Sequence, residues 1–193
     1  MGDVVLSEEQ MKQLVENVGG TKQALHISQG KAVVGILDLV MEIPKNIDID
    51  AFMDRHKETK GLRVIESKSD KRLAALNEVD LTSVELMSCV PEGDNEPIRG
   101  YERLSRLKKS PNIRLGFETF YALEETEHGI KIREFLFNNT GLRYFDFFGT
   151  IFEDVVTKVR YVLFLFRQDN GIWIYDKRSL KFSWKGNTLT LPV

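Results

Sequence analysis

The stretch that most constrains the fold is YVLFLFRQDNGIWIYD, residues 161–176, in which two apolar runs flank a polar centre. The centre is Asp169-Asn170-Gly171, and Asn and Gly accept the positive φ angles that tight turns require. Short apolar runs rich in aromatic and β-branched residues, bounded by such turns, are typical of strands. The sequence therefore predicts an antiparallel hairpin. Both faces of its arms are apolar, so we expect it mid-sheet, with one face on the core and the other under a helix.

The chain keeps this β character from about residue 130 to its end. Apolar or alternating runs are separated there by Asn-Asn-Thr-Gly and by Lys-Gly-Asn, which are turn sequences. The other strands predicted in this part are IKIREFLF, LRYFDFF, LKFSW and LTLPV. Strands joined by short turns predict an antiparallel β-meander.

The N-terminal part, residues 1–75, predicts a mixture of helices and strands. A capping box that begins at Ser7 precedes an amphipathic run, which indicates a first helix. Asp48 or Asp50 can cap a second helix that runs to about residue 58. The predicted strands of this part are residues 24–28, 31–43 and 62–67.

Residues 76–193 begin with three predicted short helices. Thr82 and Glu85 form a capping box for the first, which stops at the acidic segment PEGDNEP. Residues 98–109 form the second. The third is ambiguous, because residues 113–126 fit both the alternation of a strand and one face of a helix. The predicted fold class is α+β: an N-terminal α/β part, three short helices and a C-terminal antiparallel meander, which are compatible with one compact unit.

Composition narrows the functional classes. Hydrophobic residues make up 42% and charged residues 29% of the 193, as in folded globular proteins. A net charge of -2 excludes a chain-wide basic surface for nucleic acid but allows a local one. The first ten residues show no secretory signal, and no apolar run approaches the roughly 20 residues that span a bilayer. We therefore expect a cytoplasmic protein without a membrane partner.

The number and spacing of the cysteines, histidines and glycines do not indicate a metal site or a cofactor site. Cys89 is the single cysteine, which excludes an intramolecular disulfide and a zinc site built from several cysteines. The histidines, His26, His56 and His128, do not fall at metal-ligand spacing, and no Gly-rich phosphate loop follows a strand. We expect no metal and no cofactor.

The order of several motifs is also informative. GYERLSRLKK is followed by IRLGFETF, then by FFGTIF, and then by RYVLFLF before a Gly-Ile-Trp tip. This order, over roughly residues 80–180, resembles an uncharacterised bacterial protein family found mostly in genomes of uncultured candidate phyla. The family has no known function, so the resemblance implies architecture alone, and it favours a helix for 113–126. EDVVTK, residues 153–158, departs from the Gly-containing turn expected there.

One segment suggests an enzyme. In LRVIESKSDK, Glu66 and Lys68 are two residues apart at the end of an apolar strand, so their side chains fall on one face. Such an E-x-K pair resembles half of a metal-dependent nuclease site, in which a carboxylate holds Mg²⁺ and an ammonium group meets the developing phosphate charge. Asp38 on the preceding predicted strand could supply a second carboxylate. The alternative is an exposed strand end with solvated charges.

A second segment suggests nucleic-acid binding. Arg99, Arg103 and Arg106 fall on one face of the predicted helix 98–109, and such a stripe can contact phosphates. The segment after it carries several glutamates, which DNA would repel. The alternative interpretation is a solvated face.

These observations favour a non-catalytic interaction module whose partner is a protein. A nucleic-acid-binding protein that uses the basic helix and a nuclease built on Glu66 and Lys68 remain the alternatives.

Overall fold

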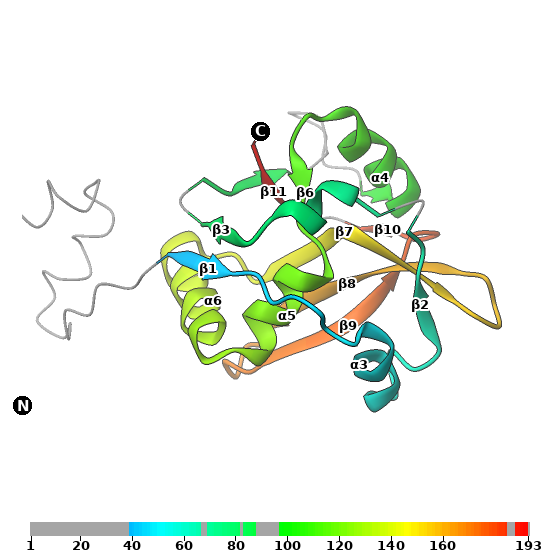
Figure 1. Ribbon diagram of the computed structural model, residues 1–193, viewed down its shortest axis with the longest axis horizontal. Coiled ribbons are helices and arrows are strands. Elements are labelled where there is room, and N and C mark those ends of the chain that lie inside the picture. Colours follow the sequence, from blue (N-terminus) through cyan, green and yellow to red (C-terminus); the bar gives the residue numbers. More distant parts are fainter. Residues whose placement is uncertain (1–38, 67–68, 82, 88–96, 185–187, 193) are drawn as a thin grey trace, which may run out of the picture.

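The computed structural model describes residues 39–66, 69–81, 83–87, 97–184 and 188–192 (Figure 1). The fold within them is α+β with mostly antiparallel strands, as the sequence predicts. None of the helices in these ranges is long and apolar enough to cross a membrane.

The main sheet is built around one long strand, β7, and has the order β4-β11-β7-β8-β9. All neighbours in it are antiparallel except β11 and β7, which run parallel. Two short strands join off this path, β2 on β7 and β6 on β11. The bounds are β2 Leu62–Val64, β4 Glu85–Met87, β6 Ile113–Arg114, β7 Tyr144–Asp154, β8 Arg160–Arg167, β9 Trp173–Ser179 and β11 Thr188–Leu191.

Two small antiparallel pairs complete the strands. The first joins β1 and β3, and the second joins β5 and β10, which fastens the start of helix α4 to the chain after β9. Their bounds are β1 Val40–Glu42, β3 Glu78–Asp80, β5 Ile98–Arg99 and β10 Ser183–Trp184.

The predicted hairpin is present. β8 and β9 pair from Tyr161↔Ser179 to Arg167↔Trp173, with Gly171 at the tip at a φ of 85°. Its predicted position in mid-sheet is wrong for one arm. β8 is internal, whereas β9 ends the sheet in the part of the chain that the structure describes.

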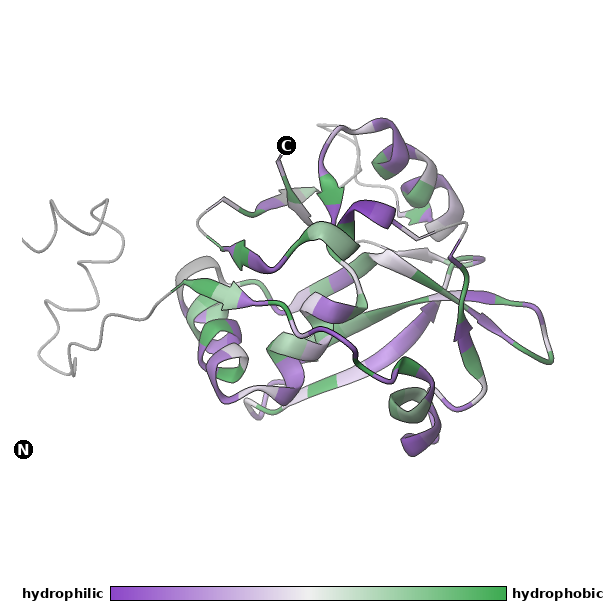
Figure 2. Cartoon of the chain, in the orientation of Figure 1, coloured by the Kyte–Doolittle hydropathy of each residue, from purple (hydrophilic) through white to green (hydrophobic). Residues whose placement is uncertain are grey.

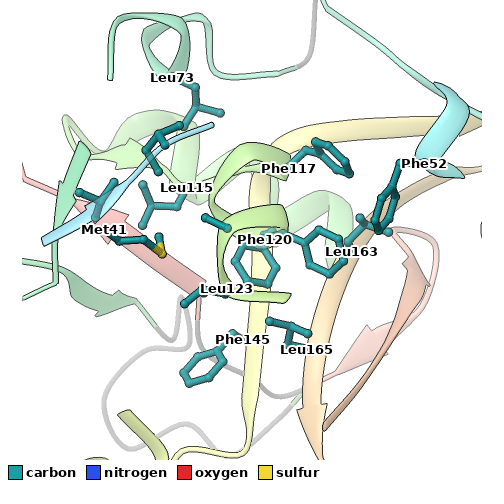
Figure 3. Packing of buried hydrophobic residues seen from close by; sticks show 14 of the residues in the cluster. Met41, Phe52, Leu73, Leu115, Phe117, Phe120, Leu123, Phe145, Leu163 and Leu165 are labelled. Atoms are coloured by element: carbon teal, nitrogen blue, oxygen red, sulfur yellow. The ribbon is translucent and has the colours of Figure 1, made fainter. Parts of the chain in front are cut away.

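Three helices cover one face of the sheet: α3 Ile49–Arg55, α5 Phe117–Glu125 and α6 Glu127–Thr140. Aromatic side chains fill the space between them and the strands (Figure 3). Phe120 packs edge-on against Phe147 with ring centroids 5.5 Å apart, and Phe52 of α3 packs against Phe117 at 5.3 Å. Residues before and after position 75 thus share this core, and the boundary at residue 75 stays a prediction.

Part of the opposite face is covered by α4, Gly100–Lys109. Leu104 and Leu107 of this helix are buried against Phe148, Ile151 and other apolar side chains of a second, smaller core. α4 matches the predicted helix over residues 98–109, and α5 settles the ambiguous segment 113–126 as mainly helical.

A close approach explains Gly149 on β7. Its N–H donates to the Leu115 carbonyl at 2.8 Å, and a Cβ at this position would lie 2.1 Å from the Arg114 carbonyl oxygen. Only glycine lets the link between β6 and α5 lie this close to β7. The pairing of β7 with β8 shifts register here, between Phe147 and Phe152.

The N-terminal predictions are confirmed where the structure describes them. Asp48 caps α3 and accepts the Ala51 N–H at 2.9 Å, and β2 lies inside the predicted strand 62–67. The helix that begins at Ser7, the strand 24–28 and most of the strand 31–43 lie outside the described residues.

The helix predicted from Thr82 and Glu85 is wrong. Residues 85–87 form β4, which pairs with β11 at Met87↔Thr188. The Glu85 carboxylate accepts the Asn112 side-chain amide at 2.8 Å and is not part of a helix cap. Pairing with a distant strand has overridden a local capping signal.

The strand predicted for IKIREFLF is also wrong, because these residues belong to α6. The Thr126 hydroxyl caps this helix by accepting the Gly129 N–H at 2.9 Å. Gly141 ends it in the left-handed conformation, at a φ of 69°. The Asn-Asn-Thr-Gly sequence interpreted as a hairpin turn is therefore the end of a helix.

Trp173 provides a test of this packing. Its indole is 8% exposed, lies stacked on Phe145 at 5.6 Å and donates to Glu134 at 2.6 Å. Trp173→Ala should lower the free energy of unfolding by about 3–5 kcal/mol, measured by urea denaturation. Trp173→Phe keeps a ring on Phe145 and should lose clearly less. A loss below about 1 kcal/mol for the alanine variant would show that Trp173 contributes little to the core.

Candidate interaction surface

A fully buried carboxylate lies between α4 and the sheet. Asp146 of β7 is 0% exposed and accepts three hydrogen bonds. The donors are Trp184 Nε1 at 2.9 Å, Arg103 Nη1 at 3.2 Å and Arg178 Nη1 at 3.3 Å. They come from β10, α4 and β9, so one side chain joins elements that are distant in sequence.

Two positive side chains face the single negative charge of Asp146. Burial raises the pKa of Asp146, while Arg178, the Trp184 N–H and Arg103 act in the opposite direction. Two guanidinium groups face one carboxylate, and one of them, that of Arg103, is 0% exposed. A charge buried to this degree requires a partner, so the contact fixes the position of α4 on the sheet.

This contact corrects the predicted arginine stripe. Arg103 points into the protein and cannot contact a phosphate outside it. Arg106 pairs with Glu102 one turn earlier on α4, at 2.9 Å, and Arg99 lies exposed at the helix start, in β5. The structure therefore does not bring the three arginines together on one exposed face.

Arg178 marks the border of the area that α4 covers. Its guanidinium carbon lies 4.2 Å from the ring centroid of Phe164, 5.4 Å from that of Trp184 and 5.9 Å from that of Tyr144. On one side of it the sheet face is closed by Trp184 and α4. On the other side of Arg178, the side chains that face outward from β7, β8 and β9 are at least partly exposed.

The uncovered part of this face is apolar. Tyr144, Phe166 and Ile174 lie directly opposite one another on β7, β8 and β9, and Tyr144 and Phe166 stack with centroids 4.4 Å apart. Tyr144 is 40% and Ile174 37% exposed. Ile172 directly precedes β9 and is 57% exposed. Its carbonyl accepts the Gln168 N–H, which extends the β8–β9 pairing, so alternation puts its side chain on the same face as Ile174. We call these four side chains the open row.

The residues of the nuclease hypothesis are only partly described. Glu66 lies exposed just after β2, while Asp38 and Lys68 lie outside the described residues. Among the residues that the structure places, no group of three or more His, Cys, Asp or Glu side chains could hold a metal ion. His56 and His128 have different neighbours. The His56 ring packs against the Tyr175 ring, and His128 Nε2 lies 3.2 Å from the Val40 carbonyl oxygen.

The sequence predicted the strands of the open row but not the row itself. The alternation Tyr144, Asp146, Phe148 places a carboxylate between two aromatic residues on one face of a strand. An acid in such an apolar strand is a signal that a buried cation is needed. Its partners, at positions 103 and 178, follow only from the fold.

No protein-family model, curated protein or solved structure matches this chain.

Two arginines of α4 offer a matched test of the buried contact. Arg103→Gln leaves the Asp146 carboxylate short of a buried cation and should lower the free energy of unfolding by about 3–5 kcal/mol. Arg106→Gln, a change of the same size on the same helix, removes an exposed pair and should change it by under about 0.5 kcal/mol. Chemical denaturation measures both. Equal effects of the two substitutions would contradict the assignment of Arg103 to the core.

Proposed function

We propose that this protein is a non-catalytic interaction module that binds a partner protein through the open row. The observation that carries this proposal is an apolar row on the half of the sheet face that α4 leaves uncovered. Tyr144, Ile174 and Ile172 are exposed there, and Phe166 between them is partly exposed. A contiguous patch of exposed apolar side chains on a folded protein is characteristic of an interaction site, whereas single exposed apolar residues are common everywhere.

The surroundings of the row support a protein partner. Interfaces combine a core rich in aromatic and apolar residues with a polar rim, and they are enriched in tyrosine, phenylalanine and arginine. The open row has Arg178, which is paired with Asp146, on one border. An arginine that is paired with a carboxylate attracts nucleic acid less than an unpaired one does. A paired charge at the margin therefore favours specific binding of a protein.

The two alternatives have less support. The nucleic-acid hypothesis relied on three arginines of one face, and Arg103 is buried. Exposed basic side chains remain on and beside α4, at Arg99 and Lys109. The nuclease hypothesis stays a proposal on Glu66 and Lys68.

Site-specific photocrosslinking tests the proposal with two exposed isoleucines as a matched pair. A benzophenone side chain at position 172, in the open row, should give a discrete adduct with a different protein in cells that carry this chain naturally. The same side chain at position 130, where Ile130 of α6 is 40% exposed, should not. Ile174→Asp should abolish the adduct from position 172, because a carboxylate in the centre of an apolar interface is costly to desolvate.

The proposal fails if positions 172 and 130 give the same adducts. It also fails if Ile174→Asp leaves the adduct from position 172 intact while the variant remains folded by circular dichroism.

A further inference from the structure

The open row ends at β9, which is an edge of the sheet in the described residues (Figure 1). β9 carries more polar residues than the internal strand β8, as Figure 2 shows along the ribbon. An edge strand presents backbone N–H and C=O groups that have no neighbouring strand, and proteins normally shield them.

The pairing with β8 shows which backbone groups of β9 point outward. Gln168 N–H donates to the Ile172 carbonyl at 2.8 Å, and Leu180 N–H donates to the Arg160 carbonyl at 2.9 Å. In an antiparallel pair the bonded residues alternate, so the even-numbered residues of β9 face β8. The backbone groups of Trp173, Tyr175 and Lys177 therefore face away from the sheet.

Most of these outward groups are available. The N–H and C=O groups of Trp173 and Tyr175 have no hydrogen-bond partner among the residues that the structure places. The N–H of Lys177 is the exception, because the Asp176 side chain turns back and accepts it at 2.6 Å. Asp176 thus shields one donor in the middle of an otherwise open edge.

We propose that the partner binds as an extended segment of another protein, which adds a strand to β9. This inference rests on the proposed function and deepens it. The added strand continues the row Tyr144–Phe166–Ile174 with an apolar side chain opposite Ile174. Opposite Asp176, on the same face, it carries a lysine or arginine, which pairs with the carboxylate and releases the Lys177 N–H to the partner's carbonyl.

The charges on β9 disfavour a second copy of this chain as the partner. When two identical strands pair about a two-fold axis, one residue lies opposite its own copy. The register that pairs all of Trp173–Ser179 is centred on Asp176 and sets two carboxylates against each other. A shift centred on Lys177 opposes two ammonium groups, and a shift centred on Tyr175 leaves Asp176 opposite Ile174. Like charges directly opposite each other destabilise a pair of strands.

The helix-covered side of the same edge carries acidic side chains near Tyr175. Burial together with the negative charges of Glu125 and Glu124 raises the pKa of Tyr175, whose side chain packs against Phe52 and Phe120. Glu58 and Glu125 are exposed. Lys177 and Arg55 add positive charge on this side. The basic preference of the added strand therefore rests on Asp176 of the open face.

A library of random linear peptides displayed on phage is a suitable probe, with the purified protein as target. We expect selected peptides to carry a basic residue two positions from an apolar one. Lys177→Pro removes the outward N–H and sets a ring in the path of an added strand, while the bonds from β9 to β8 stay intact. It should weaken binding of these peptides by at least about tenfold. Lys177→Thr, which loses the same charge but keeps the N–H, should not.

The outcomes separate the two proposals. Loss of the basic preference in Asp176→Asn would support strand addition. Selected peptides that bind Lys177→Pro as tightly as the unsubstituted protein, yet are lost in Ile174→Asp, would overturn strand addition and leave the interaction module standing. Failure to select any peptide would also overturn strand addition, and the crosslink from position 172 decides the module independently. If the purified protein were a dimer and Lys177→Pro dissociated it, the partner strand at β9 would come from a second copy of this chain and not from another protein.

Discussion

The ion pair between Arg103 and Asp146 is the contact on which the arrangement of this protein depends. A carboxylate in the middle of an aromatic strand is tolerated only when cations and N–H donors reach it, and three elements supply them. Arg103 thereby brings α4 onto one half of the sheet face. The other half, beyond Arg178, keeps its apolar side chains partly exposed. The position of one helix thus sets the border between core and surface.

The sequence predicted what is decided locally. The hairpin 161–176 has its turn residues between two apolar runs, and Asp48 caps α3 as its position indicates. The errors arise where local signals have two meanings. The sequence Asn-Asn-Thr-Gly is suited both to a hairpin turn and to the end of a helix. Both structures need a residue in the left-handed conformation, which Gly141 adopts here at the end of α6.

The site was harder to predict, because it depends on pairings across the chain. Periodicity grouped Arg103 with Arg99 and Arg106 on one face of the predicted helix. It could not tell that Arg103 meets a buried carboxylate 43 residues later. Likewise, no local pattern decides that β9 is an edge of the sheet in the described residues while β8 is internal. Both arms of the hairpin are apolar, and only the order of the whole sheet distinguishes them.

Among the residues that the structure describes, β9 is an open edge beside the open row, and amide hydrogen exchange measured by NMR reports on its outward N–H groups one by one. We expect an alternating pattern, in which the N–H groups of Trp173 and Tyr175 exchange at least about tenfold faster than those of Ile174 and Asp176. Alternation follows because the even-numbered residues are bonded to β8 and the odd-numbered ones face outward. Uniform protection along β9 in the purified protein would show that another segment already covers this edge, and would contradict an edge open to a partner.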